Sequence, residues 1–557
     1  MASKVDLVER VSYISSNTKG KDGYEDASTP VGLEDGALRA GGAPHLLSKE
    51  SFGLLAQYAA VGLVYGTLPN LVYSFLQSYL SVEGQVSTSA NALLSIPWSL
   101  KVFIGMLTDN VPIFGYRRRP FMMFGWAMCA ACLFIMGIMN VPKPFWDDPA
   151  FASKARDIPS SEWAANGLTF NKAARDAGAK YVVLMMLASL GYVIADVAAD
   201  AVLVEYAQRE PEAVRGRTQT AIYTTRTFFQ IFAQAIIAFF LNGPEYGGDF
   251  SWSIGIRAVF LILACFCVPV VFLTWFFVKE EKYAKPHFGT YIGNLWEAIQ
   301  SRAFYQVIAY SFFANVFAGV SYVASNPVMN IWIKATNLNY NLSSIFGNVV
   351  MVVTLIVTGK YGLHWNWRWV IAITMFAVIG IDVIVVMLGV WDVVRSQWFW
   401  LGVPIVEQVP ASISFIVSTY VVVELAGEGN EGACYGMMTT IMNLGSPFAL
   451  TITKNINASF DVWNDDIIAD THHVRTQVTY TIMIQYAAKL FSLVFLVLLP
   501  SQKAATQELM RKGGSSKIMG AITIFYCMFA LVWSIMTNLF SIFESTKCLK
   551  ITGGCHD

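Results

Sequence analysis

Two aspartates lie inside one of the most apolar stretches of the chain. From Leu184 to Gly216 the sequence reads LMMLASLGYVIADVAADAVLVEYAQREPEAVRG. Asp196 and Asp200 are four residues apart, so in a helix their carboxylates face the same way. A carboxylate in a membrane-spanning helix is costly unless it faces protein or water. The pair therefore indicates a transport or proton pathway.

Two basic residues are expected at the same depth as these aspartates. At about 1.5 Å per helical residue, Lys101 and Arg226 each lie about 12 Å from the cytoplasmic end of their spans. Asp200 and Asp196 lie about 9 and 15 Å from that end. The cluster is either a buried ion-pair network that holds the helices together or a site that changes partners when a solute or proton binds. Neighbouring carboxylates repel in a low dielectric, which favours proton binding by one of them.

Polar residues on other expected spans extend the candidate pathway. Glu407 and Gln408 lie about 15 Å from the outer end of their span, and Glu407 is the second-half candidate for contact with solute or proton. Hydrogen-bonded helix packing is the alternative reading. The first and seventh spans carry aromatic and amide side chains that suit a flat heterocycle, with Arg226 or Lys101 available for an anionic tail. The cavity candidates are Asn70, Tyr73, Gln77, Tyr310, Asn315 and Asn326.

The composition requires a membrane for these spans. The 557 residues are 55% hydrophobic and 14% charged, with a mean hydropathy of +0.49, whereas soluble domains carry roughly 25% charged residues. The net charge of zero implies no nucleic-acid partner. We expect about thirteen spans, at 52–80, 88–108, 120–141, 179–206, 218–242, 254–278, 303–333, 343–364, 367–390, 398–426, 433–457, 476–500 and 517–543.

Basic clusters follow the even-numbered spans and set the orientation. They contain Arg117 to Arg119, Arg209 to Arg217, Lys279 to Lys285 and Arg511 to Lys517. All fall on one side if the spans alternate, and the positive-inside rule makes that side cytoplasmic. The N-terminus is then inside and the C-terminus outside. The plasma membrane is the preferred location, with an organelle membrane as the alternative.

The domain organisation is expected to be two similar halves. Segments after the fourth and tenth spans align Glu205 with Glu424 and Glu212 with Glu431, as parallel internal repeats predict; chance similarity of apolar helices is the alternative. We therefore expect an all-α fold with a disordered cytoplasmic tail and an extra C-terminal helix. The domains are 1–50 (tail), 51–278 (first six-helix bundle), 279–302 (cytoplasmic linker with an amphipathic segment), 303–500 (second bundle) and 501–557 (cytoplasmic loop, extra helix and outer tail).

A short loop after the second span has the spacing of a gate. It reads GMLTDNVPIFGYRRRPF and contains Gly105, Asp109, Arg117, Arg118 and Arg119. One interpretation is that the arginines act only as a positive-inside signal that sets the membrane topology. The spacing resembles the loop between the second and third helices of the major facilitator superfamily, and that resemblance implies that the acid and the arginines lock the cytoplasmic side by pairing with the other half.

The resemblance becomes more specific over two stretches. IPWSLKVFIGMLTDNVPIFGYRRRPFM and ADVAADAVLVEYAQREPEAVRGRTQ together resemble the folate–biopterin transporter family of that superfamily, and the likeness covers roughly residues 52–500. It implies two six-helix bundles and alternating-access transport of pterins or folates, in symport with protons. The corresponding second-half segment, GKYGLHWNWRW, has no equivalent acid, so the lock is expected to be asymmetric.

Other functions remain as alternatives. One is a major facilitator-type carrier of another solute, such as a sugar, a nucleoside or S-adenosylmethionine, and another is a transport-inactive receptor. An intramembrane aspartyl protease is disfavoured because Asp196 and Asp200 share one helix and Asp382 stands in IGID rather than Gly-x-Gly-Asp. No P-loop or metal-ligand spacing is present, so no cofactor or metal is expected. The sequence leaves the oligomeric state open.

Overall fold

The regular structure of the described chain is helical. The computed structural model describes residues 36–46, 48–81, 84–151, 163–248, 250–282, 287–322, 324–335, 337–426, 431–457, 459–462, 464–540, 545–546 and 549. Within these residues the β structure is limited to isolated bridges, such as the one between Ile113 and Tyr116. Most of the predicted disordered tail, 1–50, lies outside the described residues.

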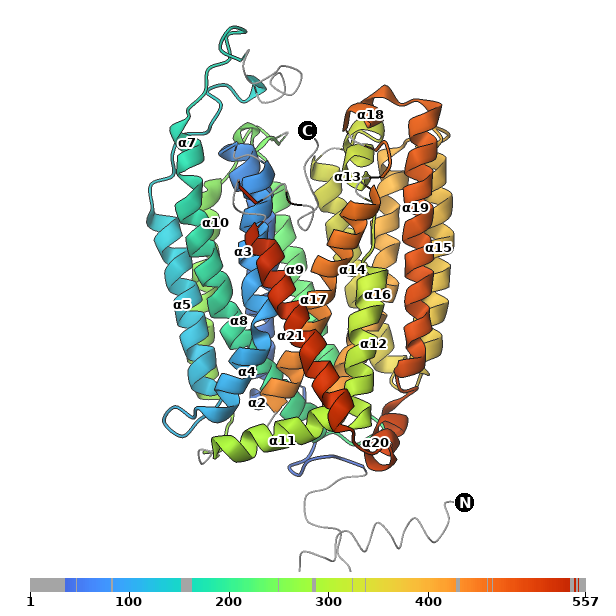
Figure 1. Ribbon diagram of the computed structural model, residues 1–557. Coiled ribbons are helices and arrows are strands. Elements are labelled where there is room, and N and C mark those ends of the chain that lie inside the picture. The colour runs from blue at the N-terminus through green and yellow to red at the C-terminus, as the bar shows by residue number, and fades with distance from the viewer. Residues whose placement is uncertain are drawn as a thin grey trace, which may run out of the picture.

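The first bundle is formed by helices between Lys49 and Phe277 (Figure 1). The second span is broken into α3 and α4, and the first and fifth end in π-helical turns. The short helices α7 (Ala173–Asp176) and η4 (Pro244–Tyr246) lie in the connecting loops. The spans are α2 (Lys49–Leu71) with η1 (Val72–Tyr79), α3 (Gly84–Ser99) with α4 (Lys101–Asn110), α5 (Arg119–Ile138), α8 (Gly178–Gln208), α9 (Arg217–Ala235) with η3 (Ile236–Phe240), and α10 (Gly255–Phe277).

The second bundle follows the surface helix α11 (Phe288–Gln300). Two short pieces, α13 (Ser325–Pro327) and η5 (Val328–Trp332), follow its first helix, and α18 (Asn464–Ala469) precedes its last. The spans are α12 (Arg302–Ala318), α14 (Asn337–Tyr361), α15 (Trp367–Val390), α16 (Gln397–Leu425), α17 (Glu431–Asn457) and α19 (His472–Ser492) with η6 (Leu493–Leu498). α20 (Lys503–Lys512) and α21 (Lys517–Phe540) complete the described helices.

Nine helices among the described residues are long and apolar enough to cross a membrane. The other expected spans are helical too, but α3 with α4 is interrupted, α12 is short, and α9 and α17 carry many polar side chains. Three of these helices pack on the opposite bundle, since α4 and α17 contact each other and α9 contacts α14. Low hydropathy at these positions is compatible with a polar pathway between the bundles.

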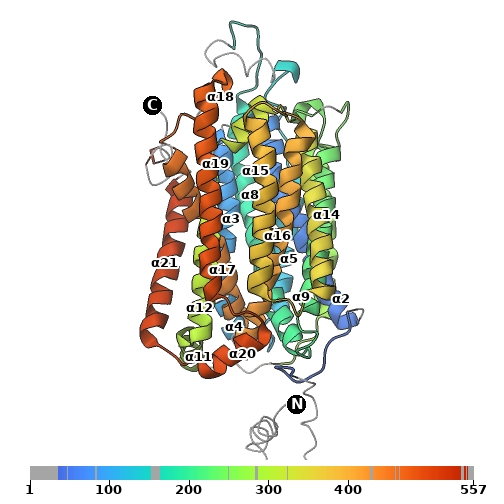
Figure 2. The ribbon, with the colours of Figure 1, turned by 90° about the vertical axis from the view of Figure 1, so that its right-hand side faces the viewer.

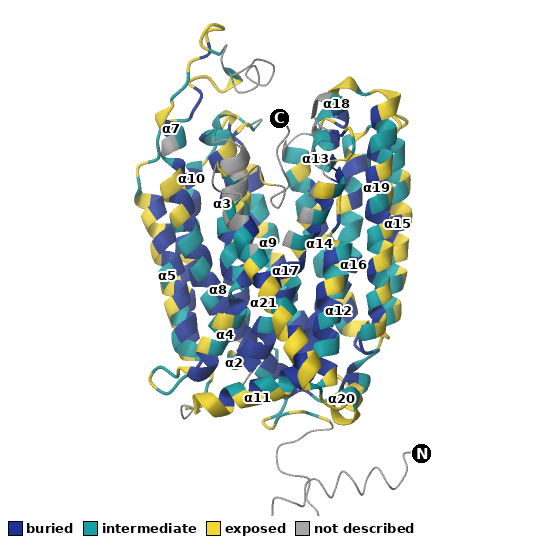
Figure 3. Cartoon of the chain, viewed as in Figure 1, coloured by how far each residue is buried: buried dark blue, intermediate teal, exposed yellow. Residues whose placement is uncertain are grey.

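The sides of the bundles are apolar and exposed, whereas the contact between them is buried (Figure 3). Phe272 on α10 is 61% exposed and Trp369 on α15 is 68% exposed. Large exposed apolar side chains on the periphery are expected of helices that face lipid.

One end of the molecule carries the basic clusters, and we call it the basic end. Arg117, Arg215 and the helices α11 and α20 gather there, at the bottom of Figure 1. α11 lies across this end with Tyr291 and Leu295 buried and Phe288 exposed, as an amphipathic surface helix does. The sequence predicts that this end is cytoplasmic.

The last described helix, α21, packs against both bundles. It contacts α3 of the first bundle and α12 and α17 of the second, on the side of the molecule away from α14 (Figure 2). Its aromatic residues Tyr526 and Trp533 pack on Phe312 and Phe448. The predicted extra helix is therefore present as a packed element of the fold.

Candidate functional site

An ion cluster lies in the interior of the first bundle. Lys101 Nζ of α4 lies 2.5 Å from Asp196 Oδ2 and 2.9 Å from Asp200 Oδ2, both on α8. Tyr58 of α2 donates a hydrogen bond of 2.5 Å to Asp200 Oδ1. All four residues are buried. Asp196 Oδ1 is buried without a hydrogen-bond partner, so the cluster retains one unused acceptor.

Breaks and close helix contacts position this cluster. Pro97 and the non-helical Leu100 interrupt the second span, and Lys101 begins the helix that follows. On the opposite side, a Cβ on Gly62 would lie 2.1 Å from the carbonyl oxygen of Arg226. Only glycine permits this approach of α2 to α9, which brings Tyr58 and Arg226 into the same layer.

Arg226 is held by aromatic rings. Its guanidinium carbon lies 5.1 Å from the ring centre of Tyr65, 5.8 Å from Trp98, and 5.9 Å from both Tyr223 and Phe415. Phe415 belongs to α16 of the second bundle, so the cage spans both halves. Among the described residues, no carboxylate makes an ion pair with this side chain. Asp196 and Asp200 act on Arg226 electrostatically, but no ion pair or hydrogen bond with a described residue occupies its guanidinium.

Lys101 also faces an aromatic ring of this layer. Its Nζ lies 4.6 Å from the ring centre of Trp98, and Trp98 Nε1 donates to the hydroxyl of Tyr192. Trp98 therefore contacts both cations, since Lys101 and Arg226 each lie within cation–π range of its ring.

The second-bundle candidates lie elsewhere. Glu407 accepts a hydrogen bond of 2.8 Å from Lys489 of α19. Gln408 packs against Gly347 of α14. The structure thus groups Glu407 with Lys489, and it does not join Glu407 to the cluster of Lys101.

The remaining cavity candidates divide into four groups. Asn70 and Asn315 each donate a hydrogen bond to a carbonyl of their own helix. Tyr310 is buried in the core. Asn326 lies in α13, and its side chain is outside the described part of the chain. Tyr73 and Gln77 are exposed and line a cavity at the other end of the molecule.

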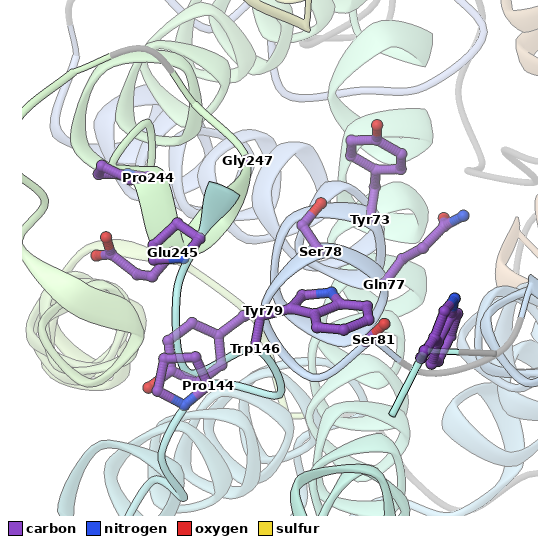
Figure 4. Close-up of a pocket in the computed structure, with 12 residues that line it drawn as sticks. Tyr73, Gln77, Ser78, Tyr79, Ser81, Pro144, Trp146, Pro244, Glu245 and Gly247 are labelled. Atoms are coloured by element: carbon purple, nitrogen blue, oxygen red, sulfur yellow. The ribbon is translucent and has the colours of Figure 1, made fainter. Parts of the chain in front are cut away.

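That cavity, of about 270 Å³, lies between the end of the first span and the outer loops of the first bundle (Figure 4). Its walls include Tyr79, Trp146 and Glu245 besides Tyr73 and Gln77. Tyr79 stacks on Tyr246, and Trp146 packs edge-on against Trp163. The predicted loop 142–178 therefore builds one wall of this cavity.

A second polar layer joins the bundles at the basic end. Asp109 of α4 is fully buried and accepts hydrogen bonds from the backbone N–H groups of Gly432 and Ala433, at 3.3 and 2.8 Å. These groups form the first turn of α17 in the second bundle, where a carboxylate is favoured. Arg118 Nη1 lies 2.6 Å from Asp109 Oδ1. Gly105 lies at the same crossing, because a Cβ there would lie 2.3 Å from the carbonyl oxygen of Gly432.

The arginines of the predicted gate have different partners. Arg117 and Arg118 lie within 4 Å of both Glu205 and Glu431, which belong to opposite bundles. Arg119 instead packs on the Trp275 ring of its own bundle.

A further pair crosses the bundles nearby. Arg215 Nη1 makes hydrogen bonds of 2.7 and 2.8 Å with the two oxygens of Glu424. The cations of these crossings come from the first half of the chain, so the contact is asymmetric.

Several residues of these two layers were not predicted as site residues from the sequence. Trp98, Tyr65 and Phe415 looked like ordinary packing residues, because aromatic residues make up 14% of the chain. Glu431 was noticed only through its alignment with Glu212, yet Glu431 is buried and Glu212 is exposed. The signal that could have revealed Glu431 is its position directly before the eleventh span.

Comparisons with known proteins agree with the helical architecture. The sequence profile of the BT1 family matches residues 62–144 and 161–517. The folate-biopterin transporter of Synechocystis sp. is 23% identical over 420 residues, which are 73% of this chain and 74% of that protein. Folate transporter 1 of Plasmodium falciparum is 27% identical over 95 residues, 17% of this chain and 18% of that protein.

Solved structures share the fold at low identity. A D-xylose–proton symporter superposes with a TM-score of 0.52 and 12% identity, covering 84% of this chain and 100% of that one. A bacterial homologue of the iron transporter ferroportin, in an outward-facing state, gives a TM-score of 0.52 at 15% identity, with 81% and 99% covered.

Proposed function

This chain belongs to the BT1 family, and on that premise we propose that it carries a folate- or pterin-type solute by alternating access, in symport with protons. The family and the major facilitator-type fold predicted from the sequence are confirmed. The chain is therefore an integral multi-pass membrane transporter. The solute and the proton are the parts that we propose.

The aromatic cage around Arg226 is the observation that carries the proposal of the solute. A guanidinium without a carboxylate partner favours an anion, and the surrounding rings favour a flat one. The cage includes Phe415 from the second bundle, so a bound solute would contact both halves. Folates combine a flat heterocycle with carboxylates, which matches this arrangement, and the Synechocystis relative is named for folate and biopterin.

The charges of this layer support coupling to a proton. Lys101 and Arg226 contribute two positive charges and Asp196 and Asp200 two negative ones, so the layer is neutral when all four are charged. A solute carboxylate on Arg226 adds one negative charge in a low-dielectric interior, where uncompensated charge is costly. One proton on an aspartate restores neutrality. Asp196 Oδ1, which has no hydrogen-bond partner, is the accepting atom that we favour.

A chain of tyrosines connects this layer to the contact between the bundles. Tyr58, which donates to Asp200, packs edge-on against Tyr223. The hydroxyl of Tyr223 meets that of Tyr435 on α17 of the second bundle. Protonation of Asp196 would weaken its pairing with Lys101, which also pairs with Asp200, and so change the contact of Asp200 with Tyr58. In this account, occupancy of the cluster is communicated to the crossing of α4 and α17.

Uptake of labelled folate into vesicles containing the purified protein tests the solute. We expect saturable uptake by the wild type, partial uptake by Arg226→Lys, and loss of about two orders of magnitude for Arg226→Ala, because the conservative variant keeps the cation. Arg257→Ala, which removes an arginine that donates to Gly137, is the matched control and should retain uptake. Equal uptake by Arg226→Ala and the wild type would contradict the proposed site.

A further inference from the structure

Residues 36–46, which precede α2, lie along the basic end (Figure 1). We call residues 36–46 the N-terminal strap. The backbone N–H groups of Leu38 and Arg39 both donate to the carbonyl of Gln208 at the end of α8, at 2.9 and 3.0 Å. The side-chain amide of Gln208 in turn donates to the carbonyl of Ala426 after α16, at 2.8 Å. The strap therefore binds the first bundle at a residue that itself reaches the second.

The side chain of Arg39 bridges the two bundles directly. Its Nη2 lies 3.1 Å from Glu431 Oε1 of α17, and its Nη1 lies 3.7 Å from Glu205 Oε2 of α8. Glu431 is fully buried, and the Arg39 side chain is 21% exposed. The strap also receives a hydrogen bond at the carbonyl of Gly36 from Arg215, the residue that pairs with Glu424 of the second bundle.

We propose that the N-terminal strap is a latch that stabilises the conformation in which the basic end is closed. A segment shifts a conformational equilibrium only by the difference in its interactions with the two states. In the closed state Arg39 contacts both Glu205 and Glu431; when α17 moves away from α8, it keeps at most one of them. The strap is anchored to the first bundle through Ser51 of α2, whose hydroxyl donates to the carbonyl of His45 at 2.8 Å. Because the strap stays attached to the first bundle, it favours the closed state without having to bind anew from solution.

This inference rests on the alternating-access part of the proposed function and is independent of solute and proton. Replacement of Arg39 leaves Arg117 and Arg118 beside both Glu205 and Glu431. Because neither carboxylate loses all its cations, the variants should fold and insert.

Cys434 provides a direct measurement of opening. It lies in the first turn of α17 beside Glu431 and is 1% exposed in the closed arrangement. In a variant that keeps Cys434 and has its seven other cysteines replaced by alanine, the rate of alkylation by a membrane-permeant maleimide reports opening of the basic end. The rate is measured in membranes, without solute and without an ion gradient.

We expect Arg39→Ala to raise the alkylation rate about fivefold, the effect of losing a partly exposed ion pair, and Arg39→Glu to raise it further. Arg39→Lys should stay close to the parent. Lys512→Ala, which removes an exposed cation that pairs with Glu508 of the same helix, is the matched control and should leave the rate unchanged. Unchanged rates in both Arg39→Ala and Arg39→Glu, or an equal rise in Lys512→Ala, would overturn the latch. Failure of folate uptake would leave this result untouched.

Discussion

Asp109 Oδ2 accepts a hydrogen bond of 2.8 Å from the backbone N–H of Ala433, across the boundary between the two bundles. The carboxylate thereby occupies the positive end of α17, a position usually filled by a residue of the same helix. Arg118 of the same half and the hydroxyl of Tyr291 on the linker helix α11 also bind this carboxylate. Closure of the basic end thus depends on a helix cap that is supplied by the opposite half.

The first prediction concerns this cap. Asp109→Asn keeps the size of the side chain but removes its charge, so Arg118 loses one of its three carboxylate partners and the first turn of α17 loses its anionic cap. We expect folate uptake to fall by about tenfold or more while the amount of inserted protein stays the same. Initial uptake rates, normalised to monodisperse protein, measure this. Asp461→Asn, an exposed change at the other end of the molecule, is the control. Uptake at the wild-type rate in Asp109→Asn would contradict the gate and leave the loop after the second span with a role in membrane topology alone.

The second prediction concerns the crossing of α4 and α17. A Cβ on Gly105 would lie 2.3 Å from a backbone oxygen of α17. At this distance the two atoms clash, so one of the two helices would have to move. We therefore expect Gly105→Ala to separate the helices and raise the alkylation rate of Cys434 at least as much as Arg39→Glu does. Gly380→Ala on α15 has open space at the corresponding position and serves as the matched control. Wild-type reactivity in Gly105→Ala would show that the crossing is not as close as described.

The third prediction concerns pH and the buried lysine of α20. Burial lowers the pKa of Lys503 to about 8, with Glu424 acting in the opposite direction. The unfolded chain holds this proton up to its ordinary pKa of about 10.4, so it binds more protons than the folded chain between these values. Stability should therefore rise as pH increases from about 8 to 10. The difference should be on the order of 2–3 kcal/mol.

Thermal unfolding of the purified protein at several pH values measures this effect. Lys503→Met should remove the lysine-dependent rise while retaining most of the side-chain volume. Lys512→Met, at an exposed site on the same helix, controls for general effects of charge. Parallel pH profiles for the wild type and Lys503→Met would contradict the assignment.

The sequence predicted the helical architecture and much of the charged layer, for physical reasons that the structure makes visible. Asp196, Asp200 and Lys101 could be placed together because helical rise and membrane depth limit where a charge can lie. Their actual pairing, and the contact of Tyr58 with Asp200, depends on the break at Leu100, which no periodicity reveals.

The partners of the remaining residues could not be predicted from spacing. Arg226 was expected in the same layer as the two aspartates, but spacing could not predict the cage of rings that surrounds it, drawn from α2, α3, α9 and α16. Arg119 resembled its two neighbours, yet it packs within its own bundle because the chain turns into α5 at that residue. The pairing of Glu407 with Lys489 joins α16 and α19, and contacts between such distant helices are set by tertiary packing.

The fourth prediction addresses coupling, the central claim, and is tested by folate uptake into vesicles with and without an imposed inward proton gradient. The wild type should accumulate folate only when the gradient is present. Asp196→Asn, which imitates the protonated carboxylate, should lose gradient-driven accumulation and retain exchange of folate across the membrane. Because Asp196 is the proposed proton acceptor, Asp200→Asn should weaken accumulation less. Each variant is first shown to be monodisperse. Folate uptake that is unchanged by the gradient and by both substitutions would contradict proton coupling.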